Sequence, residues 1–226
     1  MPATASSSAD HRIAGRIPAW VKLAYTGFLC ILVPSYWHNY GPTNFLWFCD
    51  ISLLMALAAV WVPHALWASM PAVGTLVLQA VWIVDFLAGL FGLPMTRMTD
   101  YMFRPSVPLL TRVLSLYHVW LPLFLLWLVY RRGYDRRALL AWTALAWALI
   151  LVCYFLLPAP PAPAAAPNLP VNINCVYGLS NAGPQDWMHP LTYLALVMVA
   201  LPVGAFLPTH LLLRRIFGAG GPPAGV

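Results

Sequence analysis

The chain has 226 residues, of which 62% are hydrophobic and 8% are charged. A soluble domain carries roughly 25% charged residues, so this composition excludes an ordinary soluble protein and indicates an integral membrane protein. The net charge is +6, but the basic residues stand in short clusters at the ends of apolar runs. That pattern is typical of membrane helices and argues against a nucleic-acid partner.

Six apolar runs come close to the roughly 20 residues that a helix needs to cross a bilayer. They cover residues 18–36, 44–62, 66–91, 108–130, 138–157 and 190–213. We therefore predict an all-α integral membrane protein, a six-helix bundle over residues 17–217. The polar tails 1–16 and 218–226 are expected to be disordered, and the Pro- and Ala-rich start of segment 158–189 predicts an extended outer loop.

The distribution of Lys and Arg predicts the orientation of the bundle. Nine of the twelve basic residues fall before or at the start of span 1, between spans 4 and 5, or after span 6. With six spans, these clusters share one side, which the positive-inside rule assigns to the cytoplasm. We expect both termini in the cytoplasm and the chain in a bacterial inner membrane. The inverted topology stays open, because Arg97, Arg104 and Arg112 lie on the other side.

Three ionisable residues are predicted at a similar depth in the outer half of the bundle. At 1.5 Å per residue, Asp50 lies about 9 Å inside span 2, Asp85 about 9 Å from the outer end of span 3, and His118 about 15 Å inside span 4. Ionisable side chains are costly in a membrane and usually serve a function there. Residues expected to flank this layer as substrate contacts are Asn44, Trp47, Trp82, Tyr117 and, from a loop folded over the bundle, Asn174.

Three chemistries are open to this layer. Two carboxylates and an imidazole suit a divalent metal cofactor with Asp50, Asp85 and His118 as ligands. Alternatively, an Asp orients His118 as a general base acting on a hydroxyl or a water. In the third, the carboxylates relay protons or bind a cation during transport. Each residue alone could equally serve a structural hydrogen bond between helices.

Two further groups of residues carry weaker expectations. Cys175 is a candidate for a disulfide if its compartment is oxidising, and no CxxC or His/Cys metal spacing occurs. Several aromatic residues fit the belts at the two membrane interfaces. They are Tyr36, Trp37, Tyr40, Trp61, Trp67, Tyr130 and Trp187.

The six-span plan, with a polar residue near the outer start of span 2 and a His in span 4, resembles the androgen-induced and androgen-dependent family of membrane hydrolases. It also resembles the YwaF-like proteins of bacteria. The first resemblance implies a catalytic Thr and His, which would be Thr43 and His118, and fatty acid esters of hydroxy fatty acids as substrates. Asp50 and Asp85 are additional to that pattern. The stretches GPTNFLWFCD, TDYMF and NINCVYG also resemble bacterial membrane-associated proteins.

These observations predict a membrane protein with an outer-leaflet polar pocket that acts on a membrane lipid. The leading hypothesis is a hydrolase or transferase of lipid esters, with His118 as the base and Thr43 or a water as the nucleophile. The alternative is a non-enzymatic protein, either a carrier of a cation or small solute, or an accessory subunit. A clear GxxxG stripe for helix assembly is not present in the sequence.

Overall fold

The computed structural model describes residues 16–93, 95–96 and 98–217, and these residues contain helices and loops but no strand. The expectations for residues 1–15 and 218–226 and for Arg97 lie outside the described part of the chain. The helices are α2 (Ala19–Tyr40), η1 (Pro42–Leu46), α3 (Phe48–Trp61), α4 (Ala65–Leu90), η2 (Asp100–Phe103), α5 (Leu109–Ser115), α6 (Tyr117–Arg132), α7 (Ala138–Leu156), η3 (Ile173–Cys175), α8 (Pro190–Leu201), η4 (Pro202–Phe206) and α9 (Leu207–Phe217).

Five helical segments among the described residues are long and apolar enough to cross a membrane. They are Ala19–Tyr40, Ala65–Leu90, Leu109–Arg132, Ala138–Leu156 and Pro190–Phe217. The second predicted span, 44–62, is the exception, since α3 has 14 residues and is only about 21 Å long at 1.5 Å per residue. The chain is thus an all-helical, multi-pass membrane protein with one short helix among the long ones.

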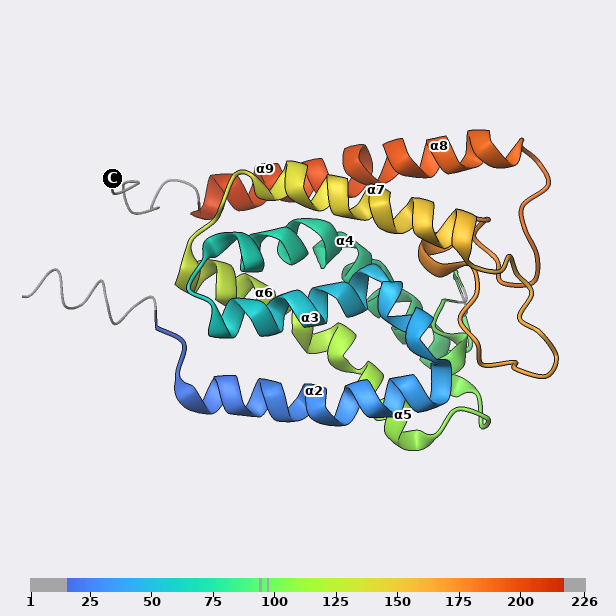
Figure 1. Ribbon diagram of the computed structural model, residues 1–226, viewed down its shortest axis with the longest axis horizontal. Helices are drawn as coiled ribbons and strands as arrows, with labels where there is room; N and C mark the ends of the chain where they lie inside the picture. The colour runs from blue at the N-terminus through green and yellow to red at the C-terminus, as the bar shows by residue number, and fades with distance from the viewer. Residues whose placement is uncertain (1–15, 94, 97, 218–226) are drawn as a thin grey trace, which may run out of the picture.

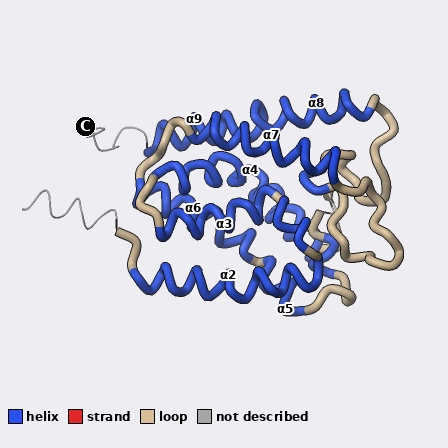
Figure 2. Tube along the Cα trace, in the orientation of Figure 1, coloured by secondary structure: helices blue, strands red, loops and turns tan. Residues whose placement is uncertain are grey.

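The long helices run side by side along the long axis of the molecule (Figure 1). The short links 62–64 and 133–137 lie at the end where α2 begins and α9 ends, whereas the described residues of the loop after α4 and the loop 157–172 gather at the opposite end (Figures 1 and 2). We call these the short-link end and the loop end. The start of α2 and the end of α9 therefore share one end of the molecule.

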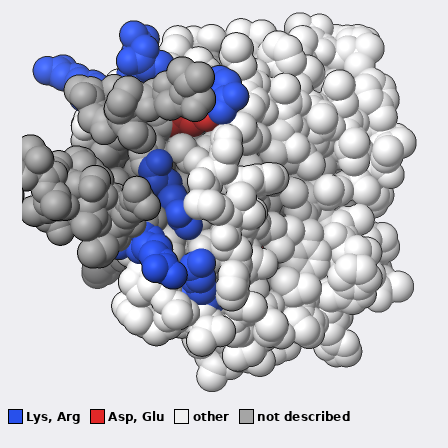
Figure 3. All heavy atoms as spheres, turned by 60° about the vertical axis from the view of Figure 1, so that its left-hand side comes forward, with Lys and Arg blue, Asp and Glu red and all other residues white. Residues whose placement is uncertain are grey.

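Most of the Lys and Arg side chains of the described residues gather at the short-link end, while the rest of the described surface in this view is nearly free of charge (Figure 3). This grouping agrees with the clusters expected from the sequence. Its members are Arg16, Lys22, Arg131, Arg132, Arg136, Arg137, Arg214 and Arg215. Side chains of this kind are expensive in hydrocarbon, so the short-link end lies in or beyond a membrane interface.

Helix α4 forms the centre of the bundle and packs against α3, α6 and α7. Small residues on α4 permit close approach, and Gly74 is the clearest case, because the indole of Trp142 from α7 fills the space where a side chain would begin. Close packing through small residues is how helices associate in lipid, where burial of apolar surface gives little driving force.

Candidate functional site

Asp50 lies in the first turn of α3 and not two turns inside a continuous helix, because the predicted run 44–62 breaks at Trp47. Trp47 has extended backbone angles (φ −62°, ψ 139°) between η1 and α3. Such a break leaves backbone groups without helical partners. The Asn174 side chain provides the missing hydrogen-bond partners. Its Oδ1 accepts from the Phe48 amide at 3.1 Å, and its Nδ2 donates to the Leu46 carbonyl at 2.9 Å.

The Asp50 carboxylate is 3% exposed and accepts two hydrogen bonds. Asn44 Nδ2 donates to its Oδ2 at 3.1 Å, and the Tyr117 hydroxyl donates to its Oδ1 at 3.2 Å. The one ion pair in the described part of the chain joins Asp135 and Arg137 at the short-link end. Asp50 therefore has neutral donors but no cationic partner among the described residues, which is an expensive arrangement for a buried carboxyl group.

His118 is held on three sides. Its ring stacks on Trp82 from α4, with centroids 4.2 Å apart, and on the neighbouring Tyr117, with centroids 4.1 Å apart. Its Nδ1 lies 2.8 Å from the Ser115 carbonyl oxygen. Because a carbonyl oxygen can only accept, this bond places the proton on Nδ1 and leaves Nε2 as the basic nitrogen. No described side chain or backbone group bonds to Nε2.

A break between α5 and α6 makes this hydrogen bond available. In a regular helix, the Val119 amide would bond to the Ser115 carbonyl, but here it bonds to the Leu116 carbonyl at 3.0 Å. The freed Ser115 carbonyl accepts from His118 instead. The break that interrupts the helix therefore also fixes the orientation of the imidazole.

Asp85 does not join Asp50 and His118, although its predicted depth is similar. Its carboxylate accepts from the Thr96 amide at 2.6 Å, the Thr99 amide at 3.0 Å and the Thr99 hydroxyl at 2.7 Å. These bonds fasten the loop after α4 back onto the helix end. Depth along a helix says nothing about the face on which a side chain lies, and Asp85 belongs to the face that meets this loop.

The loop that Asp85 fastens brings Tyr101 against the polar residues, a contact that the sequence did not indicate. The side chains of Ser115 and Trp82 lie near the Tyr101 phenol, and burial raises the pKa of that phenol. Tyr36 is also buried, at 3% exposed, and its hydroxyl lies 2.6 Å from the Ser115 hydroxyl. The prediction that Tyr36 belongs to an aromatic belt is therefore wrong, because its side chain points into the bundle.

Three polar side chains, of which only Gln79 is fully buried, have buried atoms without a hydrogen bond. They are the Tyr40 hydroxyl, the Thr43 hydroxyl and both amide atoms of Gln79, which is 1% exposed. Tyr40 lies close enough to Asp50 for the two to interact electrostatically. Gln79 precedes Trp82 by one turn on α4. Unpaired buried groups are rare in native proteins and often mark a functional position.

The structure thus joins Asn44, Asp50, Tyr117, His118 and Trp82 in one connected group, which we call the polar centre. Asn174 supports the group through the start of α3. The predicted nucleophile Thr43 and the predicted substrate contact Trp47 make no side-chain hydrogen bond, and Trp47 packs at the edge of the apolar core.

The polar centre is closed. Asn44 is 7% exposed, and the other four members are 6% exposed or less. Within the described residues, no three His, Cys, Asp or Glu side chains come close enough together to hold a metal ion. The four cysteines, including Cys175, are free thiols. Comparisons with family models, with curated proteins and with solved structures gave no match for this chain.

Proposed function

We propose that this protein is a membrane enzyme that hydrolyses or transfers the acyl group of a lipid ester, with His118 as its general base. The observation that carries the proposal is the state of the imidazole. Both ring faces and Nδ1 are occupied, and Nε2 alone has no partner. A base that is fixed in orientation and has one free nitrogen is what acid–base catalysis requires.

The reaction would begin with proton transfer to Nε2 from a hydroxyl group as that hydroxyl attacks the ester carbonyl. The Thr43 side chain is a candidate nucleophile, because its buried Oγ1 has no hydrogen-bond partner. A water would serve equally. The protonated imidazole would then return the proton to the leaving alcohol, so that hydrolysis yields one acid and one alcohol. With Thr43 as nucleophile, an acyl-enzyme forms first and water releases it.

Asp50 would act as a positioning residue and not as a direct partner of the base. It bonds the Tyr117 hydroxyl, and the Tyr117 ring lies against His118. The carboxylate partner of His118 expected from the sequence is replaced by the Ser115 carbonyl. Tyr117→Phe should therefore lower turnover by less than His118→Ala does, because it removes the hydrogen bond that fixes the ring of residue 117 against His118 but leaves the base in place.

The membrane orientation is part of the proposal. We infer that η1 and α3 together make the second of six passes of a bacterial inner-membrane protein, with the basic short-link end in the cytoplasm. The polar centre then lies toward the outer leaflet. Because it is closed, substrate entry requires the loop that Asp85 fastens to move aside, as the lids of many enzymes do.

The test is hydrolysis by the purified full-length protein in detergent. A series of acyl esters of increasing chain length would be used, together with a fatty acid ester of a hydroxy fatty acid. We expect hydrolysis by the wild type and a loss of 100-fold or more in His118→Ala, the usual scale of a general base. His189→Ala is the matched control, because His189 is exposed at the start of α8. Undiminished hydrolysis by His118→Ala would refute this function.

A second candidate is a carrier of protons or of another cation. The buried Asp50 without a cationic partner favours it, since such carboxyl groups often bind the transported ion. A transport assay distinguishes the carrier from the enzyme. In proteoliposomes, a carrier would move the ion in the wild type and not in Asp50→Asn, whereas an enzyme would show no flux in either.

A further inference from the structure

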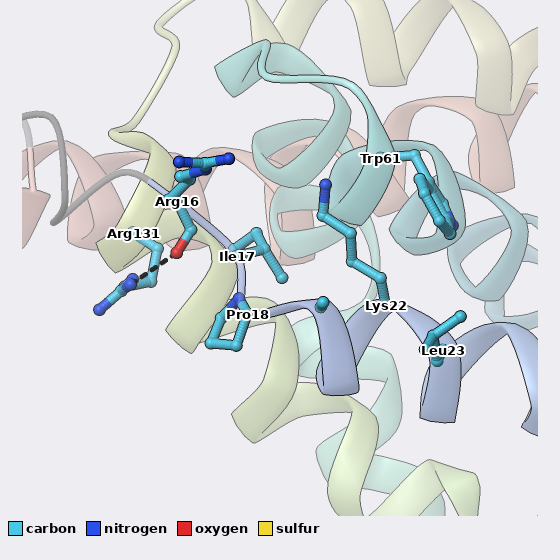
Figure 4. Close-up of a pocket in the computed structure, with 8 residues that line it drawn as sticks. Arg16, Ile17, Pro18, Lys22, Leu23, Trp61 and Arg131 are labelled. Atoms are coloured by element: carbon cyan, nitrogen blue, oxygen red, sulfur yellow. Dashed lines mark hydrogen bonds between the residues drawn. The ribbon is translucent and has the colours of Figure 1, made fainter.

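A cavity lies far from the polar centre, at the short-link end (Figure 4). Its volume is about 570 Å³, and it lies between the start of α2, the end of α3 and the end of α6. Three cationic side chains line it, from Arg16, Lys22 and Arg131. The rest of its wall consists of Ile17, Pro18, Ala19, Leu23 and Trp61.

The cations of this cavity are held in place without an anionic partner among the described residues. Arg131 donates to the Arg16 carbonyl at 2.7 Å, which is the dashed bond in Figure 4. The Lys22 ammonium lies 5.0 Å from the centroid of the Trp61 ring. The one described Asp at the short-link end, Asp135, is paired with Arg137. Three positive charges therefore share one concave surface without a described anion, which favours binding of an anion from outside the chain.

A second cavity continues along the same pair of helices. It has a volume of about 380 Å³ and, apart from Thr26, an apolar lining. Thr26, Leu29, Cys30, Val33 and Pro34 come from α2, and Leu54 and Leu57 come from α3. Since α2 leaves the short-link end and α3 returns to it, both sets of residues lie next to the first cavity on the side away from that end.

The two cavities meet at a hydrogen bond. Trp61 lines the first cavity, Thr26 lines the second, and the Trp61 indole donates to the Thr26 hydroxyl at 3.1 Å. Leu23 and Thr26 are separated by one helical turn, about 4.5 Å at 1.5 Å per residue. A cationic cavity at the short-link end and an apolar groove therefore lie one after the other along the α2–α3 seam, with the Trp61–Thr26 hydrogen bond between them.

We propose that this seam binds one anionic phospholipid. Its phosphate would rest on Arg16, Lys22 and Arg131, and one acyl chain would lie in the groove lined by Cys30 and Leu57. Basic pockets between membrane helices bind acidic headgroups, and Lys and Arg are the usual phosphate ligands. The apolar groove selects a lipid over free phosphate, because the ion alone would leave the groove unused. This site is independent of the function proposed for His118.

Native mass spectrometry of the full-length protein in detergent tests the headgroup part. The probes are phosphatidylglycerol and phosphatidylcholine with identical acyl chains. We expect one phosphatidylglycerol to bind, and Lys22→Gln/Arg131→Gln to weaken its binding about ten- to thirty-fold. Lys22→Gln alone, which leaves the Arg131 bond intact, should give a smaller loss. Arg214→Gln/Arg215→Gln is the matched control, since it removes the same charge from exposed positions of α9 at the same end.

The free thiol of Cys30 tests the acyl part, because it is exposed and lines the groove. Phosphatidylglycerol should slow its alkylation by N-ethylmaleimide several-fold, while inorganic phosphate should not. Three results would overturn the proposal. They are equal binding of the two lipids, an equal loss in the Arg214 and Arg215 control, and displacement of phosphatidylglycerol by inorganic phosphate at a similar concentration.

Discussion

Replacing Gly74 by Ala should destabilise the bundle, although Ala is the better helix former. A Cβ atom built on Gly74 would lie 1.7 Å from Cε2 and 1.9 Å from Nε1 of Trp142. Ordinary contact begins near 3.4 Å, so the indole would have to withdraw. It is fully buried, and the rings of Phe48 and Phe206 lie against it, with centroids 6.0 and 6.3 Å away. The clash therefore cannot be relieved by a simple change of rotamer.

The expected loss follows from two opposing terms. Overpacking of a well-packed core costs about 1–3 kcal/mol, and the exchange of Gly for Ala within a helix returns up to about 1 kcal/mol. Because the overlap is with the middle of a buried indole, the cost falls in the upper part of the first range, about 2–3 kcal/mol. The net loss in the free energy of unfolding is therefore about 1–2 kcal/mol. For a chain of this size, that loss lowers Tm by roughly 2–8 °C.

Thermal unfolding of the purified protein in detergent, followed by size-exclusion chromatography, measures this change. Gly27→Ala is the matched control, because nothing lies within 4 Å of the Cβ position there, and its Tm should stay the same or rise. In a Trp142→Leu background, Gly74→Ala should lose most of its effect, since the two residues are in contact. A Tm for Gly74→Ala equal to that of the wild type, or an equal loss in both backgrounds, would contradict the packing described for α4 and α7.

Three further predictions concern the loops. Asp85→Asn should remove acceptors from the loop after α4, cost about 1–3 kcal/mol and speed limited proteolysis there, while Asp186→Asn, at an exposed position, should not. Asn174→Ala should cost at least as much, because it loses two bonds at the α3 break and Ala tolerates the observed φ of 58° poorly; protection of the Phe48 amide from hydrogen exchange reports the loss. The hydrogen bond from Arg137 holds the pKa of Asp135 below its usual range. This ion pair therefore stabilises the folded protein above about pH 4, and the stabilisation is lost as the pH falls through the lowered pKa of the folded state. Asp135→Asn should therefore flatten the acid limb of the Tm profile.

Several residues of the polar centre could be anticipated from the sequence, but the hydrogen bonds and ring contacts that connect them could not. Asp50 and His118 stand out because ionisable residues are rare in apolar helices. Asp85 met the same criterion, but its carboxylate accepts hydrogen bonds from Thr96 and Thr99. The difference arises from the face of α4 on which Asp85 lies and from the path of a loop without any periodic pattern. Tyr101 and Tyr36 were missed because an aromatic residue near a span end usually lies at the interface.

The sequence by itself determined that the chain is helical, that it belongs in a membrane and which end of the helix bundle is basic. These properties sum over residues one at a time, because each apolar or charged side chain has its own cost of leaving water. Only the tertiary structure decided that two helices break at Trp47 and Leu116, that Asn174 and Ser115 meet the broken ends, and that two cavities align along the α2–α3 seam. Those features depend on contacts between distant segments, and no pattern within a single segment encodes them.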